Sequence, residues 1–128
     1  MPFRRVFSDA RWESEVGYCR ALRADGRIFV TGTAPVAPDG SVHAIGDGYA
    51  QALRCLEIIR HAVEELGGKI EHITRTRMFV TDIARWEEYG RAHSEVFREH
   101  PPTTTMVEVR RLIHPDMLIE IEADAVVA

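Results

Sequence analysis

Two stretches of the chain repeat apolar residues every three or four positions, as the buried face of an α-helix does. The first stretch follows Asp47, a predicted N-cap, and ends at Gly67-Gly68, where a left-handed residue would stop the helix. The second runs from Ala84 to about Arg98, before Pro101-Pro102. The predicted inward faces are Tyr49, Leu53, Leu56, Ile59, Val63 and Leu66 in the first helix, and Trp86, Tyr89, His93, Val96 and Phe97 in the second.

The last quarter of the chain alternates apolar and polar residues, which is typical of β-strands. The alternation covers residues 103–109 and 118–127 and is broken at His114-Pro115-Asp116, so we predict a closing hairpin of two strands joined by a short loop. Alternate side chains leave a strand on opposite faces. One face is therefore aliphatic, with Val107, Val109, Ile119, Ile121, Ala123 and Ala125, and the other holds Thr104, Met106, Glu108, Arg110, Glu120, Glu122 and Asp124.

Three further segments have strand character. Residues 4–7 predict a short first strand, and residues 73–80 a longer one rich in strand formers. Between them, residues 18–23 and 28–31 flank Asp25-Gly26, a hairpin turn signal because glycine tolerates positive φ. Residues 8–16 stay unassigned, and residues 33–46 predict a loop with one extended piece near Val42.

The order of these elements is strands, helix, strand, helix and two strands. Two helices of this length can cover one face of a sheet of five or six strands, which predicts a two-layer α+β fold. At 128 residues the chain has room for one hydrophobic core, so we expect a single domain spanning residues 1–128. The uncovered face of the sheet mixes charges with apolar residues, which favours packing between subunits around polar clefts.

Composition narrows the classes of function. The chain lacks an apolar run of the ~20 residues that span a bilayer, and its N-terminal residues lack the apolar core of a signal peptide, so we expect a cytoplasmic protein without a membrane role. Its net charge of −4, without a dense basic block, disfavours nucleic-acid binding. Cys19 and Cys55 have no disulfide or metal spacing, and the six histidines form no ligand pattern. We predict neither a metal nor a cofactor.

Glu120 has two interpretations from the residues alone. A partly desolvated carboxylate within hydrogen-bond reach of an electrophilic carbon can act as a general base or hold a water molecule. A strand carboxylate can equally pair with a basic residue across an interface, here Arg75, Arg77 or Arg110. For Glu122 and Asp124, which share its face, structural ion pairs are favoured, and His93 is expected to be a satisfied core or interface histidine.

Four segments together resemble the Rid family (reactive intermediate deaminases, also called the YjgF family). They are Gly17-Tyr18, residues 28–32 followed by Pro35, residues 75–82, and residues 107–109 through 119–123. The resemblance covers nearly the whole chain. It implies a chorismate-mutase-like fold with a mixed sheet, a homotrimer, and three clefts between neighbouring subunits. It also implies hydrolysis of enamines or imines to keto acids and ammonia.

Within that resemblance, several positions match the family's cleft and others depart from it. Tyr18 falls on the cleft tyrosine, Thr31 and Gly32 on a serine-glycine pair, and Glu120 on the acid that orients the attacking water. The arginine that holds the substrate carboxylate is replaced by Thr104, and the nearby cysteine by Met106. Since a hydroxyl offers at best one neutral hydrogen bond where a guanidinium offers a charged fork, deamination of 2-imino acids becomes doubtful.

Two hypotheses remain open at this point. The first is a hydrolase, or deaminase, acting on a small imine, enamine or related electrophile, with Glu120 as the catalytic residue. Tyr18, Thr31, Gly32, Thr104 and Met106 would bind the substrate. The second is a non-catalytic trimer that binds a small metabolite or has a regulatory role. In both, the expected partners are two further copies of the chain and a small molecule.

Overall fold

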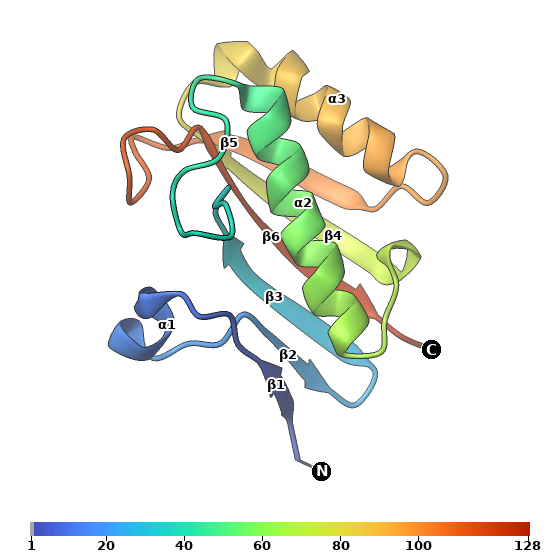
Figure 1. Ribbon diagram of the computed structural model, residues 1–128. Coiled ribbons are helices and arrows are strands. Elements are labelled where there is room, and N and C mark those ends of the chain that lie inside the picture. Colours follow the sequence, from blue (N-terminus) through green and yellow to red (C-terminus); the bar gives the residue numbers. More distant parts are fainter. Residues whose placement is uncertain (1) are drawn as a thin grey trace.

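The computed structural model describes residues 2–128, and it consists of one six-stranded sheet with two long helices packed on one face (Figure 1). The strands are β1 (Arg4–Val6), β2 (Ala21–Ala24), β3 (Arg27–Thr33), β4 (Ile73–Val80), β5 (Thr103–Glu108) and β6 (Ile119–Val126). The covering helices are α2 (Gly48–Glu65) and α3 (Trp86–Phe97), and a short helix, α1 (Arg11–Val16), lies beside the sheet. The predicted two-layer α+β architecture is confirmed.

The sheet is mixed, with strand order β1-β2-β3-β6-β4-β5. All neighbouring strands are antiparallel except β4 and β5, which are parallel. The predicted closing hairpin is therefore wrong, because β4 lies between β5 and β6 and pairs with both of them. Alternating sequence patterns identify strands but do not tell which neighbour a strand takes, and residues 109–118 are long enough to cross one strand.

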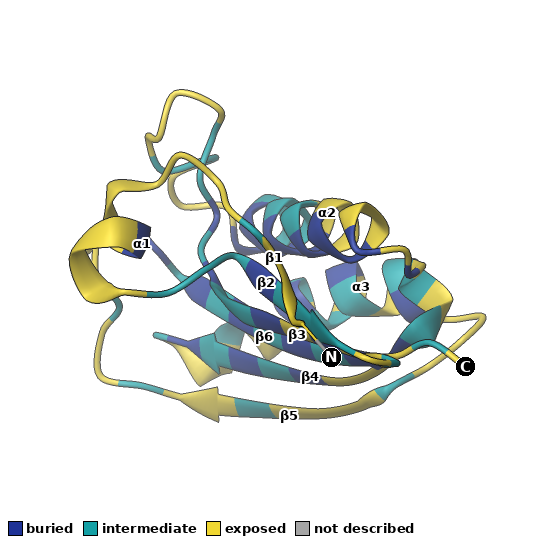
Figure 2. Cartoon of the chain, turned by 90° about the horizontal axis from the view of Figure 1, so that it is seen from below, coloured by how far each residue is buried: buried dark blue, intermediate teal, exposed yellow. Residues whose placement is uncertain are grey.

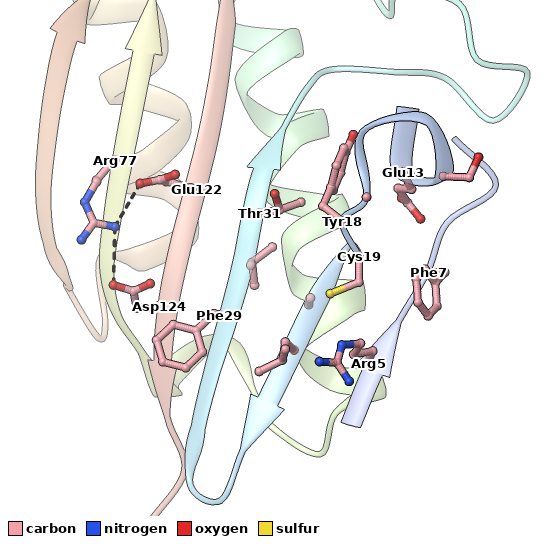
Figure 3. A pocket seen from close by; sticks show the side chains of 15 residues that line it. Arg5, Phe7, Glu13, Tyr18, Cys19, Phe29, Thr31, Arg77, Glu122 and Asp124 are labelled. Atoms are coloured by element: carbon pink, nitrogen blue, oxygen red, sulfur yellow. Dashed lines mark hydrogen bonds and ion pairs between the residues drawn. The ribbon is translucent and has the colours of Figure 1, made fainter. Parts of the chain in front are cut away.

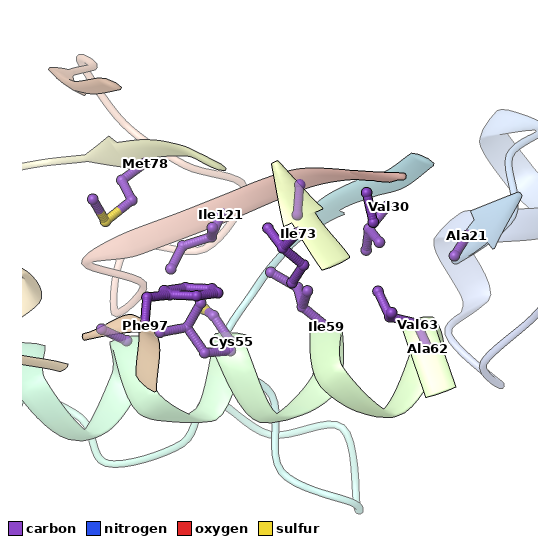
Figure 4. Close-up of a cluster of buried hydrophobic side chains, with 14 of the residues drawn as sticks. Ala21, Val30, Cys55, Ile59, Ala62, Val63, Ile73, Met78, Phe97 and Ile121 are labelled. Carbon is purple, nitrogen blue, oxygen red and sulfur yellow. The ribbon is translucent and has the colours of Figure 1, made fainter. Parts of the chain in front are cut away.

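Helix α2 provides most of the layer that covers the sheet. The side chain of Asp47 accepts a hydrogen bond from the Ala50 amide, and Gly67 follows the helix with φ 85°, so both predicted end signals hold. Its buried face packs on β3, β6 and α3, with Ile121 of β6 and Phe97 of α3 in the same cluster (Figure 4). The predicted stripe is buried from Leu56 to Leu66, whereas Tyr49 and Leu53 at its start are only partly buried.

Helix α3 follows a 3₁₀ turn, Ile83–Arg85. The side chain of Asp82, the residue before this turn, accepts a hydrogen bond from the Ala84 amide. Tyr89 and Phe97 are buried against the core as predicted. Trp86 was expected to point inward, but 56% of it is exposed. It occupies the first position of the helix.

The β2–β3 hairpin forms at the predicted turn with one difference. The residue with positive φ is Asp25, at 53°, and not Gly26. Gly26 is needed for space, because a Cβ there would lie 2.7 Å from the backbone oxygen of Val127. The isolated bridge between Val36 and Val42 confirms the extended piece expected in the loop that precedes α2.

The face of the sheet opposite the helices is uncovered. Both edge strands, β1 and β5, are largely exposed (Figure 2). Alternation places Phe29, Val107 and Val126 on the uncovered face, and each is more than two-fifths exposed. Among residues 2–128, the helices are too short or too polar to cross a membrane.

Candidate functional site

Glu120 lies in a cavity of about 870 Å³ at the end of β3. Its walls come from the α1 region, the loop after β3, α2 and the segment that leads into β6. Four of the six residues predicted for the cleft meet here: Tyr18, Thr31, Gly32 and Glu120. They come from segments far apart in the sequence, which the β2–β3–β6 arrangement brings together.

A bulge in β3 gives Glu120 its place. Three steps along β3, from Val30 to Thr33, face two steps along β6, from Ala123 to Ile121. One extra residue is thereby inserted near Thr31 and Gly32, and the strand bends there. A Cβ on Gly32 would overlap the Glu120 carboxylate. The carboxylate thus rests on the bare backbone of Gly32, and any side chain at this position would displace it.

The Glu120 carboxylate is only partly solvated. Desolvation by burial raises its pKa, the charge of Arg20 opposes that effect, and the neighbouring Glu122 adds to it. Within residues 2–128 of one chain, the carboxylate makes no hydrogen bond or salt bridge, so it pairs with neither Arg75, Arg77 nor Arg110 of its own chain. A desolvated carboxylate without a partner has the properties that a base or water-binding group requires.

Arg20 and Glu13 form a buried ion pair at the wall of this cavity, which sequence reasoning missed. Glu13 is 4% exposed, and its carboxylate lies 3.6 Å from Arg20 Nε and accepts hydrogen bonds from Ser8. Arg20 Nη1 also donates to Thr33 Oγ1, at 3.4 Å. Helix α1 has no side-chain N-cap, and its single turn and a half carries no apolar period, so nothing in the pattern identified it.

Tyr18 and Thr31 shape the cavity in different ways. The guanidinium of Arg20 lies 5.8 Å from the centre of the Tyr18 ring, which holds the ring at the cavity wall. The Thr31 amide donates to the Arg20 carbonyl oxygen, at 3.1 Å, so it is used within the fold. The Thr31 amide is therefore not free to bind an anion.

Carboxyl groups outnumber guanidinium groups around the cavity. Arg54 is already engaged, with Nη1 2.6 Å from Glu57 Oε1 and Nε donating to the Val36 carbonyl oxygen. The net charge of the lining is therefore negative, with Asp9, Asp39, Glu57, Glu65 and Glu120 against Arg20 and Arg54. Such a lining disfavours anionic ligands and suits neutral or cationic ones.

Thr104 and Met106 lie elsewhere in the chain. The register pairs them with Thr76 and Met78, whose side chains are buried on the helix side of the sheet. Met106 packs against the core, and Thr104 accepts a hydrogen bond from Thr76. The prediction that they share a face with Glu120 is wrong. Paired residues of neighbouring strands point to the same side of a sheet, and the partners of Thr104 and Met106 in β4 face the helices. Within one chain, the six predicted residues form two separate groups.

A second cavity, of about 660 Å³, lies on the uncovered face of the sheet. Tyr18 and Thr31 line it too, together with the half-buried Cys19 (Figure 3). Arg77 Nη1 lies 3.1 Å from Glu122 and 3.4 Å from Asp124. The structural ion pairs favoured for these two carboxylates are therefore confirmed. Glu122 is thus paired, whereas Glu120 has no ion-pair partner among the described residues.

The remaining chemistry-bearing residues are accounted for by the fold. His61 pairs with Glu65 at 3.0 Å on the exposed side of α2, and His93 hydrogen-bonds to Thr76. Burial raises the pKa of the Cys55 thiol, which keeps it protonated. In the described part of the chain, no three histidine, cysteine, aspartate or glutamate residues gather in a way that could hold a metal ion.

Comparison with known proteins links this geometry to characterised relatives. The model of the family described as Endoribonuclease L-PSP matches residues 8–127. The 3-aminoacrylate deaminase RutC of Acinetobacter baylyi is 34% identical over 108 residues, covering 84% of this chain and 85% of that protein. The crystal structure of Rv2704 from Mycobacterium tuberculosis, a member of the YjgF/YER057c/UK114 family, superposes with a TM-score of 0.90 at 40% identity and covers 98% of this chain and 100% of that one. Escherichia coli TdcF with bound serine gives a TM-score of 0.82 at 28% identity, with 98% and 94% covered.

Proposed function

Because this chain belongs to the endoribonuclease L-PSP family, also called the YjgF/RidA family, and has its chorismate-mutase-like fold, we propose that it is a hydrolase of small reactive imines or enamines. The observation that carries the proposal is the desolvated and unpaired carboxylate of Glu120, which rests on Gly32 beside Tyr18. The name of the RutC relative, a 3-aminoacrylate deaminase, supports the same class of reaction.

Glu120 would hold a water molecule and accept its proton as the oxygen attacks the imine carbon. A C–O bond forms, the electron pair of the C=N bond moves to nitrogen, and nitrogen takes up a proton. The resulting carbinolamine loses ammonia as its C–N bond breaks, which leaves a carbonyl compound. An enamine enters the same path after a proton is added to its carbon atom. The reaction consumes one water molecule and needs no oxidant or metal.

The description of the matched family as an endoribonuclease fits this chain poorly. Each nucleotide of RNA carries a phosphate charge, and proteins meet these charges with concentrated basic groups. Here the lining of the cavity that holds Glu120 carries more carboxyl than guanidinium groups, and the net charge of the chain is −4. A small, uncharged or cationic substrate agrees with this lining far better than a polyanion does.

The hydrolase proposal is tested by ammonia release. Imines are generated in the assay by an amino-acid oxidase, which gives 2-iminopropionate, and by an amine oxidase, which gives an uncharged aldimine. We expect the protein to accelerate ammonia release over buffer for at least one of them. Equal rates with and without protein for both substrates would contradict the proposal. They would leave a metabolite-binding trimer, which the threonine at position 104 favours, as the alternative.

We further propose that the chain assembles as a homotrimer and that its clefts lie between subunits. Two features support this: the uncovered face of the sheet exposes Phe29, Val107 and Val126, and Thr104 and Met106 lie on the opposite face of the sheet from Glu120 within one chain. A neighbouring copy can bring the two groups together and cover the exposed apolar face.

Sedimentation equilibrium is expected to give three times the 14.5 kDa mass of the chain. Phe29→Glu places a second carboxylate opposite Asp124 on the uncovered face and should shift the population to monomer. Arg60→Glu, on the exposed side of α2, is the control for a charge change and should keep the mass of the wild type. A monomeric wild-type protein would overturn the trimer.

A further inference from the structure

The cavity that holds Glu120 has an apolar wall for which the proposed chemistry has no use. Its volume of about 870 Å³ lies in the range of pockets that bury drug-sized ligands, whereas an imine of a few carbon atoms fills only a small part of it. Buried or half-buried apolar side chains from β1, the loop after β3, α2 and the segment before β6 line the rest: Val6, Ala34, Val36, Ile58, Ala62 and Met117.

Four more exposed apolar side chains continue this wall to the rim of the cavity. Phe7, Val16 and Ile113 are each about two-thirds exposed or more, and Trp12 is 38% exposed. Trp12 and Val16 are one turn apart on the same side of α1, while the Glu13 side chain is buried in its ion pair with Arg20. Single exposed apolar residues are ordinary, but several around one cavity mark a surface that binds a ligand.

The charges of the lining indicate which kind of apolar ligand fits. Its two arginines are already paired, Arg20 with Glu13 and Arg54 with Glu57. Glu120 is half-buried and has no such partner within residues 2–128. A cationic group beside Glu120 would gain a charge partner in a poorly solvated place, whereas an anionic group would meet a lining in which carboxyl groups are in excess.

We propose that this cavity binds a ligand with two parts, a cationic nitrogen directed to Glu120 and an apolar substituent of several carbon atoms that lies against Val36, Ile58 and Met117 and extends towards Trp12. As a statement about a substrate, this inference rests on the proposed hydrolase. It then names the substrate class as the imines of apolar primary amines. A protonated imine carries the required positive charge, and its carbon is more electrophilic than that of the neutral form.

NMR titrations with three stable compounds separate the two parts of the ligand. Hexylammonium has the positive charge and a long chain, ethylammonium has the charge with a short chain, and hexanoate has a chain of similar length with a negative charge. The protein has two tryptophans, so ¹⁵N-labelled protein gives two indole N–H signals. Trp12 lines the cavity, and Trp86 is not among its lining residues, so Trp86 is the internal control. Trp86→Phe assigns the two signals.

We expect hexylammonium to shift the Trp12 signal and to leave the Trp86 signal in place. Its Kd should be at least about tenfold lower than that of ethylammonium, because each fully buried methylene group contributes about fourfold. Its Kd should also be at least about fivefold lower than that of hexanoate. A stationary Trp12 signal, equal shifts of both signals, or a Kd for hexylammonium no lower than that of either other compound would overturn the inference.

A matched pair of variants on α2 tests the apolar wall. Ile58→Thr places a hydroxyl on the wall, and Leu53→Thr makes the same kind of change at a partly buried position of the same helix outside the lining. Ile58→Thr should weaken hexylammonium binding about threefold or more and leave ethylammonium binding unchanged, while Leu53→Thr should change neither. Thermal unfolding verifies that each variant is folded. Equal losses in both folded variants would contradict the assigned wall.

The hydrolase proposal and this inference fail separately. If neither imine of the ammonia assay is hydrolysed faster than in buffer while hexylammonium binds as expected, the hydrolase proposal fails and the ligand class stands. If 2-iminopropionate is hydrolysed rapidly while hexylammonium binds no better than ethylammonium, the hydrolase proposal stands and the inference fails.

Discussion

Replacing Glu120 with glutamine is expected to lower kcat/KM for imine hydrolysis by about 10²- to 10⁴-fold, the usual contribution of a positioned general base. Glutamine keeps the shape and the hydrogen-bonding reach of the side chain but cannot accept a proton. Since the carboxylate has no hydrogen-bond or salt-bridge partner in the described chain, its loss should leave the fold intact. Steady-state ammonia release, with thermal unfolding as the check on folding, measures both effects.

The pH dependence gives this prediction a second readout. The carboxylate must be ionised to act, and burial raises its pKa, so the acid limb of kcat/KM should lie above the 4.5 of an ordinary glutamate. Glu122 is the neighbouring like charge that contributes to this rise. Glu122→Gln, the matched control, should keep the plateau and move the acid limb to lower pH. A full plateau in Glu120→Gln would contradict the role of Glu120.

Gly32→Ala tests the same geometry without touching the carboxylate itself. The added Cβ overlaps the Glu120 carboxylate, and the flexible end of that side chain is what must move. Activity should fall while stability changes little, because displacement by about 1 Å is enough to disturb a catalytic contact. Wild-type activity in Gly32→Ala would contradict the proposal that the Glu120 carboxylate acts from its position against residue 32.

The sequence was sufficient for features that depend on local pattern. The Asp47 cap, the stop at Gly67 and the bounds of β4 all follow from residues that are close together along the chain, and the structure confirms them. The resemblance added the mixed sheet and the grouping of Tyr18, Thr31, Gly32 and Glu120. These residues meet because the order of β2, β3 and β6 is a property of the family's fold.

Features that depend on strand pairing could not be read from the pattern. Alternation assigned Thr104 and Met106 to the Glu120 face because it took β5 and β6 as direct partners. In the structure β4 lies between them and is parallel to β5. Each side chain of β5 therefore points to the same side as its partner in β4, which places Thr104 and Met106 on the other face from Glu120. The hydrogen bonds that join Thr76 to His93 and to Thr104 are a consequence of this pairing, so they too were hidden.

Glu13→Met is expected to lower the free energy of unfolding by about 3–5 kcal/mol, the cost of removing one partner from a buried ion pair. Methionine fills a similar volume, so the main loss is the charge that faces Arg20, whose side chain is only 12% exposed. The amide and hydroxyl of Ser8 also lose their acceptor. Urea unfolding at a fixed protein concentration, which holds subunit assembly constant, measures the change.

Two variants test whether the loss of stability in Glu13→Met comes from the unpaired charge of Arg20. Glu15→Met removes a carboxylate of α1 that pairs with Arg11 in solvent, with side chains 55% and 71% exposed, and should change stability by less than about 1 kcal/mol. Glu13→Met/Arg20→Met removes both buried charges, and a well-packed apolar pair often matches a buried ion pair in stability. The double variant should therefore be more stable than Glu13→Met alone. If it is less stable, Arg20 contributes through Thr33 and Tyr18 instead, and the wall of the Glu120 cavity depends on arginine itself.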